Sequence, residues 1–169
     1  MRNLLFIHGA GGYLEDRPLA HDLGAALSAK VLMPRLPDEG MSFEAWAGPV
    51  RRALATIDAT DRVIAHSFGA SILLGVLAEN APRPTSAALL AMPDWSRQGW
   101  DVAEYAFALP QPHPPLSLHH CEDDEVVPFS HLSLNSSRLP SAKAWPHSSG
   151  GHQFTGLIAE LAKESAGAR

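Results

Sequence analysis

The sequence predicts an α/β fold, a three-layer α/β/α sandwich with a mostly parallel sheet of about six strands. Short apolar segments alternate with longer amphipathic segments through most of the 169 residues. Several of the short segments are apolar throughout, as strands are when a parallel sheet covers them on both faces. Units of strand, helix and parallel strand join by right-handed crossovers, which distributes the helices over both faces of the sheet.

The expected elements follow one another along the whole chain. The strands are expected at residues 3–8, 30–34, 61–66, 85–92, 115–121 and 143–146. The helices are expected after Asp16, after Ser42, and at residues 68–79, 128–139 and 154–165.

Residues near the expected helix starts support these assignments. Asp16 and Ser42 are residue types that cap helices with a side-chain oxygen, and Pro18 suits a first turn. Pro49 lies inside the second helical pattern, where we expect it to kink or split the helix. Gly75 interrupts the apolar third helix and indicates close packing against a neighbouring element.

Residues 93–114 break the alternation, because they contain four prolines and show no clear period. We expect a long surface loop there, and such loops at the carboxyl ends of strands often build sites. The loop carries four aromatic side chains: Trp95, Trp100, Tyr105 and Phe107. They fit two roles equally well, a satellite core or a wall that contacts substrate.

The composition limits the classes of protein that fit. An apolar fraction of 46% with 18% charged residues indicates one globular domain spanning residues 1–169. A net charge of −5 argues against nucleic-acid and membrane partners. Cys121 is the single cysteine, so no disulfide framework forms, and we expect it to be a buried apolar residue. The apolar run before His8 is too short for a signal segment, which makes the cytoplasm the expected location.

Ser67 stands between the third expected strand and the third expected helix. A sharp turn there lifts a hydroxyl above the sheet, near the positive end of the helix. The flanking positions that pack against the helix hold small residues, Ala65 and Gly69. This pattern is A-x-S-x-G, where G-x-S-x-G is usual. Taken alone, the string also fits a turn serine or a helix cap.

A serine nucleophile needs a base, and the base needs an orienting carboxylate. On this type of fold the order along the chain is serine, acid, histidine. The segments "EDDEVVPFS" (122–130) and "SSGGHQF" (148–154) supply both groups after the fifth and sixth expected strands. All three candidates therefore lie at one edge of the sheet, where parallel α/β folds bind ligands.

Four segments together, "FIHGAGG", "AHSFGA", "DDEVVP" and "GGHQF", resemble the α/β-hydrolase superfamily over nearly the whole chain. The nearest resemblance is to its small lidless serine hydrolases, the retinoblastoma-binding-protein-like group. The resemblance implies a minimal α/β-hydrolase fold with no lid domain. It also implies a serine hydrolase that forms an acyl-enzyme on small carboxylic esters; thioester, amide and peptide substrates stay open.

The resemblance also implies roles for individual residues. Asp124 opens a D-x-x-V-P string and is the expected acid, and His152 follows a glycine pair and opens the last helix as the expected base. With Ser67 they form the catalytic triad. Asp123 and Asp94 are alternative acids.

The oxyanion donors that the resemblance implies are backbone N–H groups, those of Phe68 and Ala10, with Gly11 as the fallback for Ala10. Gly11 and Trp95 are the expected substrate contacts. No cofactor or metal is implied, and the expected partner is a small acyl substrate, with no feature of the sequence supporting a protein partner.

Other histidines receive structural assignments. We expect His8 to bond local backbone, His66 to be a packing neighbour, and His147 to be a solvated loop residue or part of the pocket rim. The segment "HHCEDDE" (119–125) resembles a metal site in composition, yet adjacent residues of a strand point to opposite faces, which argues against one shared ion. The rival function is a non-catalytic binding module on a hydrolase scaffold.

Overall fold

The computed structural model describes residues 2–79, 84–107 and 114–167. Its sheet has six strands in the order β2-β1-β3-β4-β5-β6, and every neighbouring pair is parallel. The strands are β1 (Asn3–Ile7), β2 (Lys30–Leu32), β3 (Arg62–His66), β4 (Ala87–Leu90), β5 (Leu116–Cys121) and β6 (Lys143–His147). The predicted parallel α/β sheet is confirmed.

Among the described residues, an α-helix follows every strand except β4, and one short 3-10 helix lies in the long β4–β5 connection. They are α1 (Arg17–Ala26), α2 (Phe43–Leu54), α3 (Phe68–Leu77), α4 (Ser130–Arg138), α5 (Ile158–Gly167) and the 3-10 helix η1 (Ala103–Tyr105). No helix of the described segments is long and apolar enough to cross a membrane.

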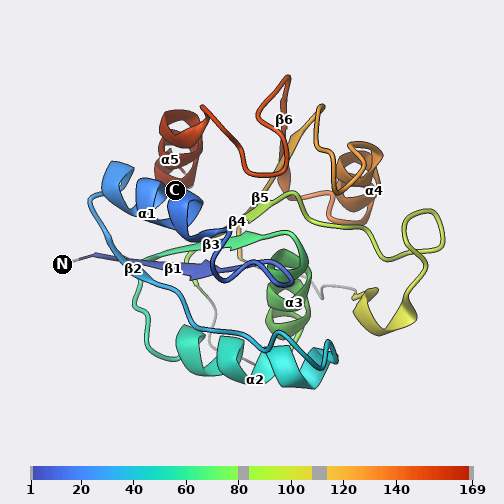
Figure 1. Cartoon of the computed structure of the whole chain (residues 1–169), viewed down its shortest axis with the longest axis horizontal. Coiled ribbons are helices and arrows are strands. Elements are labelled where there is room, and N and C mark those ends of the chain that lie inside the picture. Colours follow the sequence, from blue (N-terminus) through green and yellow to red (C-terminus); the bar gives the residue numbers. More distant parts are fainter. Residues whose placement is uncertain (1, 80–83, 108–113, 168–169) are drawn as a thin grey trace.

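Two apolar clusters hold the three layers together. One packs α2, α3 and α4 against a face of the sheet and includes the fully buried Trp46. The other packs α1 and α5 against the opposite face and includes the fully buried Phe154. Figure 1 shows α1 beside α5 on one side of the strands and α2 with α3 on the other. The helices therefore leave the carboxyl edge of the sheet to the connecting loops.

Three details differ from the sequence-based expectation. Asp16 occupies the N-cap position of α1, but its side chain makes no capping bond and turns toward the sheet. Pro49 does not split α2, because the buried face on either side of it, which includes Trp46 and Val50, holds the helix against the core. The last helix begins at Ile158 instead of residue 154, because Phe154 and Gly156 both adopt positive φ.

Other local predictions are confirmed. Ser42 caps α2, with its hydroxyl accepting a hydrogen bond from the Ala45 N–H at 3.4 Å. A Cβ at Gly75 would lie 2.6 Å from the ring of Phe43 and 2.7 Å from that of Phe107, so only glycine fits between these rings.

Candidate active site

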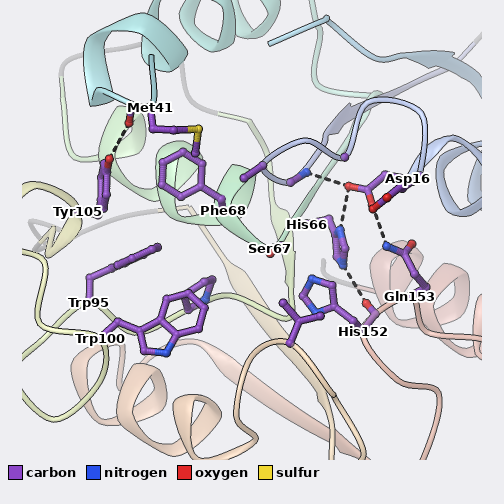
Figure 2. A pocket seen from close by; sticks show the side chains of 16 residues that line it. Asp16, Met41, His66, Ser67, Phe68, Trp95, Trp100, Tyr105, His152 and Gln153 are labelled. Carbon is purple, nitrogen blue, oxygen red and sulfur yellow. Dashed lines mark hydrogen bonds and ion pairs between the residues drawn. The ribbon is translucent and has the colours of Figure 1, made fainter. Parts of the chain in front are cut away.

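A cavity of about 430 Å³ opens at the carboxyl edge of the sheet. Its lining comes from the segments that follow all six strands, so residues far apart in the sequence meet there. Ser67 and His152 both line it (Figure 2). This is the position where parallel α/β sheets bind ligands.

Ser67 has an unusual backbone conformation at the turn from β3 into α3. Its φ is 53° and its ψ is −126°, a region that L-residues rarely adopt. The turn places the hydroxyl in the cavity, and the hydroxyl makes no hydrogen bond within the described residues. Strain of this kind is retained where the surrounding structure holds a functional side chain in place.

Two glycines allow the β1–α1 loop to lie against the serine. A Cβ at Gly69 would lie 2.3 Å from the carbonyl oxygen of His8, so the start of α3 packs directly on the end of β1. A Cβ at Gly9 would lie 3.0 Å from the Cβ of Ser67. Ala65 is fully buried without disturbing this contact, so its extra methyl group is accommodated.

Asp124 and His152 are in direct contact. The Nδ1 atom of His152 lies 3.0 Å from both carboxylate oxygens of Asp124. The carboxylate also accepts hydrogen bonds from the Val126 and Val127 N–H groups at 2.9 Å, and the His120 ring lies 3.2 Å away. Burial alone raises the pKa of Asp124, but these hydrogen bonds outweigh it and hold the pKa well below its usual range.

The second nitrogen of the His152 ring remains available for chemistry. The Nε2 atom makes no hydrogen bond to any residue that the structure describes, and the ring borders the cavity that holds the Ser67 hydroxyl. Because Asp124 is an acceptor, it orients the proton of the ring to Nδ1 and leaves the Nε2 lone pair facing the cavity. Nucleophile–base hydrogen bonds are often long in sites without substrate.

The backbone around Ser67 offers unpaired donors. Ala10 and Phe68 both line the cavity, and neither N–H has an acceptor among the described residues. Phe68 is the first residue of α3, where a helix leaves its N–H groups without partners. Gly11, the fallback donor and expected substrate contact, does not line the cavity, whereas its neighbours Gly9 and Gly12 do.

Aromatic side chains form one half of the cavity. Trp95, Trp100 and Tyr105 from the β4–β5 connection line it together with Phe68 and Met41 (Figure 2). The Tyr105 hydroxyl donates to the Met41 carbonyl at 2.6 Å, which ties this connection to the segment before α2.

The loop aromatics divide between the core and the cavity. Trp95 and Tyr105 pack on the core and also line the cavity, while Phe107 packs on Phe43 away from it.

The alternative acids have other partners. Asp123 accepts hydrogen bonds from the Gly150 and Gly151 N–H groups at 3.2 and 2.8 Å, and so supports the loop that carries His152. Asp94 is fully buried and pairs with Arg138 at 2.9 Å. Neither carboxylate bonds the ring of His152.

Two further assignments made from the sequence have clear outcomes. The His8 ring contacts the Gly9 carbonyl at 2.7 Å and accepts from the Leu36 N–H at 3.0 Å, which confirms its structural role. His147 is neither solvated nor at the cavity; it is buried at the end of β6, 3.2 Å from His119. That expectation was wrong because β6 extends one residue further than the sequence indicated.

Cys121 lies in the apolar core at the end of β5. Cys121 is buried as expected, and this burial, with the nearby carboxylates, raises the pKa of its thiol to about 12. In the described ranges, no group of three or more His, Cys, Asp and Glu side chains is arranged to hold a metal ion.

The sequence-based reading missed a second Asp–His contact beside the first. The Nδ1 atom of His66 lies 2.9 Å from the Asp16 carboxylate, and its Nε2 atom lies 2.9 Å from the carbonyl oxygen of His152. His66 is thus more than a packing neighbour. The available signal was its position directly before Ser67, at the sheet edge where the other site residues gather.

Comparison with solved structures identifies proteins that share this fold. No family model and no curated protein sequence matches this chain. Among solved structures, the ydeN gene product from B. subtilis is similar, with a TM-score of 0.74, 17% identity and coverage of 98% of this chain and 99% of that chain. A lipase-esterase related protein from Clostridium acetobutylicum has a TM-score of 0.74 and 14% identity, covering 99% of this chain and 94% of that one.

A third similar structure is MGS-M1, an α/β hydrolase enzyme from a Medee basin deep-sea metagenome library. Its TM-score is 0.71 at 19% identity, with coverage of 94% of this chain and 74% of that chain. These similarities show that the chain has the α/β-hydrolase fold, as the sequence predicted.

Proposed function

We propose that this protein is a serine hydrolase that acts on small carboxylic esters through an acyl-serine intermediate. Ser67 is the nucleophile, His152 the general base and then the general acid, and Asp124 the group that holds the correct tautomer of the histidine. The backbone N–H groups of Ala10 and Phe68 are the proposed oxyanion donors, each worth about 3 kcal/mol in the transition state.

One observation carries this proposal: a strained serine and the uncommitted nitrogen of an aspartate-bound histidine face the same cavity. In the first step the Ser67 oxygen bonds to the ester carbonyl carbon while its proton passes to His152. The proton then moves from His152 to the departing alkoxide, which leaves an acyl-enzyme. Water repeats the two transfers, releases the acid and restores the serine.

The lining of the cavity supports an uncharged, partly apolar substrate. Trp95, Trp100 and Tyr105 offer an apolar surface to the acyl or alcohol group. Glu15 and Asp16 are the charged residues on the lining, and no Lys or Arg borders the cavity in the described part of the chain. An anionic substrate would therefore lack a counter-charge and meet repulsion.

A fluorophosphonate probe, which forms a covalent bond with activated serines, tests the proposal. We expect stoichiometric labelling of the wild type, none for Ser67→Ala, and a loss of p-nitrophenyl ester turnover of about four to six orders of magnitude in that variant. Ser133→Ala removes an exposed hydroxyl on α4 and serves as the matched control. Turnover that survives in Ser67→Ala refutes the assignment, and a wild type with neither labelling nor turnover favours the binding-module alternative.

A further inference from the structure

The Asp16–His66 pair is almost completely shielded from solvent. The side chains of His66 and Asp16 are 1% and 2% exposed. Besides His66, the Asp16 carboxylate accepts hydrogen bonds from the Gly9 N–H at 2.8 Å and from the Gln153 side-chain amide at 2.9 Å. These three donors stabilise the buried carboxylate, because an unpaired oxygen at this depth would cost free energy of folding.

The partners of His66 determine where its protons lie. Its Nε2 atom faces the carbonyl oxygen of His152, which only accepts hydrogen bonds, so Nε2 carries a proton. Its Nδ1 atom faces Asp16. Burial raises the pKa of Asp16, but the hydrogen bonds from His66 and its other donors lower it to about 2, so the carboxylate is ionised. Each ring nitrogen of His66 therefore faces a hydrogen-bond acceptor.

These bonds join two loops that come from opposite ends of the chain. The β1–α1 loop contributes Gly9 beside the proposed donor Ala10, and the β6–α5 loop contributes the His152 carbonyl and the Gln153 side chain. Figure 2 shows the pair beside Gln153, on the side of Ser67 opposite to Trp95, Trp100 and Tyr105. The pair therefore connects the backbone of His152, the proposed base, to the loop that carries Ala10, the proposed oxyanion donor.

We propose that Asp16 and His66 are positioning residues, which hold the backbone of His152 at a fixed position relative to the β1–α1 loop. This inference rests on the proposed function for its kinetic consequence, whereas the link between the loops stands on the contacts themselves. Neither residue exchanges a proton with substrate, because the hydrogen-bonding capacity of the His66 ring is already filled. Misplacement of a reacting group by about 1 Å costs on the order of 100-fold in rate.

Two amide substitutions separate the two bonds of His66. The amide nitrogen of asparagine lies as many bonds from Cβ as Nδ1 does, and that of glutamine as many as Nε2. His66→Asn therefore keeps the donor to Asp16 and loses the one to the His152 carbonyl, whereas His66→Gln does the reverse. Asp16 retains two other donors in His66→Gln, while the His152 carbonyl loses its partner in His66→Asn.

The kinetic readout compares these variants per folded molecule, with folding checked by circular dichroism and urea unfolding. We expect kcat for a short p-nitrophenyl ester to fall about 10- to 100-fold in His66→Asn and less than tenfold in His66→Gln, with KM within about twofold of wild type in both. A purely structural role predicts equal losses that follow the folded fraction. Equal kcat values for the two folded variants overturn the proposal.

Hydrogen exchange of backbone amides provides a readout that does not require activity. Residues 148–156 should exchange at least about tenfold faster in His66→Asn than in wild type, while strands β1 and β3 keep their protection. Unchanged exchange in that loop overturns the link. If the wild type proves inactive toward esters and the fluorophosphonate, the proposed function fails, and the exchange result alone decides whether the two loops are linked.

Discussion

Two aspartate–histidine pairs lie side by side at the carboxyl edge of this sheet. Asp124 contacts His152 at 3.0 Å, Asp16 contacts His66 at 2.9 Å, and the two imidazole rings are 4.6 Å apart between centroids. Both carboxylates are buried, and hydrogen bonds lower the pKa of each against the opposing effect of burial. By residue type and distance, the two pairs are nearly the same.

They differ in what the second ring nitrogen faces. The Nε2 atom of His152 faces the cavity and has a free lone pair, whereas that of His66 donates to a backbone carbonyl. A ring with a free lone pair can accept a proton from a nucleophile; a ring with two fixed partners can only hold its neighbours in place. The contact of the remote nitrogen, more than the Asp–His contact itself, therefore separates a candidate base from a structural pair.

The comparison predicts its largest effect for His152→Ala. If His152 is the base, turnover should fall about four to six orders of magnitude, because the His66 ring, the other imidazole on the cavity lining, has partners at both nitrogens. Its free energy of unfolding should change by less than about 1 kcal/mol, since the ring borders the cavity and Asp124 is its one side-chain hydrogen-bond partner among the described residues. Ester hydrolysis and urea unfolding measure the two quantities. Combining it with Ser67→Ala should add little; additive losses would contradict a shared mechanism.

Asp124→Asn tests the orienting carboxylate. An asparagine amide favours the wrong tautomer of His152 and removes the charge that stabilises the imidazolium, so we expect kcat to fall about 10⁴-fold. Asp123→Asn is the matched control, because its one side-chain oxygen can still accept from the Gly151 N–H, the shorter of the two bonds, and only the longer bond from the Gly150 N–H is lost. It should lose less than about tenfold. If kcat falls more in Asp123→Asn than in Asp124→Asn, Asp123 and not Asp124 orients His152.

Much of this arrangement could be predicted from the sequence because it depends on local patterns. Buried parallel strands are apolar throughout, so their order and spacing place Ser67, Asp124 and His152 after β3, β5 and β6. The end of each strand fixes which sheet edge its following residue occupies. The close packing at Gly75 could also be predicted, because a glycine inside an apolar helix costs stability unless packing requires it.

The Asp16–His66 pair could not be predicted in this way. Asp16 also has the sequence signature of a helix cap, and a capping bond and a long-range bond use the same oxygens. The choice between them depends on the His66 ring, 50 residues away, and on the carbonyl of His152, 86 residues beyond it. A backbone carbonyl has no side-chain signature at all, so this partner of His66 is invisible in a sequence.

The smallest expected effect is a pH-dependent difference in stability for Asp16→Asn. The folded state lowers the pKa of Asp16 from 3.8 to about 2, so the ionised carboxylate stabilises the folded state. This contribution is about 2 kcal/mol, is complete above pH ~4, and disappears as the pH falls through ~2. The variant should therefore be less stable than wild type by about 2 kcal/mol at pH 7, and by only about half of that at pH 3.

Urea unfolding at pH 7, 5 and 3 measures this difference between wild type and Asp16→Asn. The control is Asp22→Asn, whose side chain is 59% exposed, so its difference from wild type should stay within about 0.5 kcal/mol at each pH. A gap for Asp16→Asn that is the same at pH 7 and pH 3 would mean that charge makes no contribution at this position. The Asp16–His66 pair would then act through hydrogen bonds between neutral groups, and it would share its geometry with Asp124–His152 but not the charge of the carboxylate.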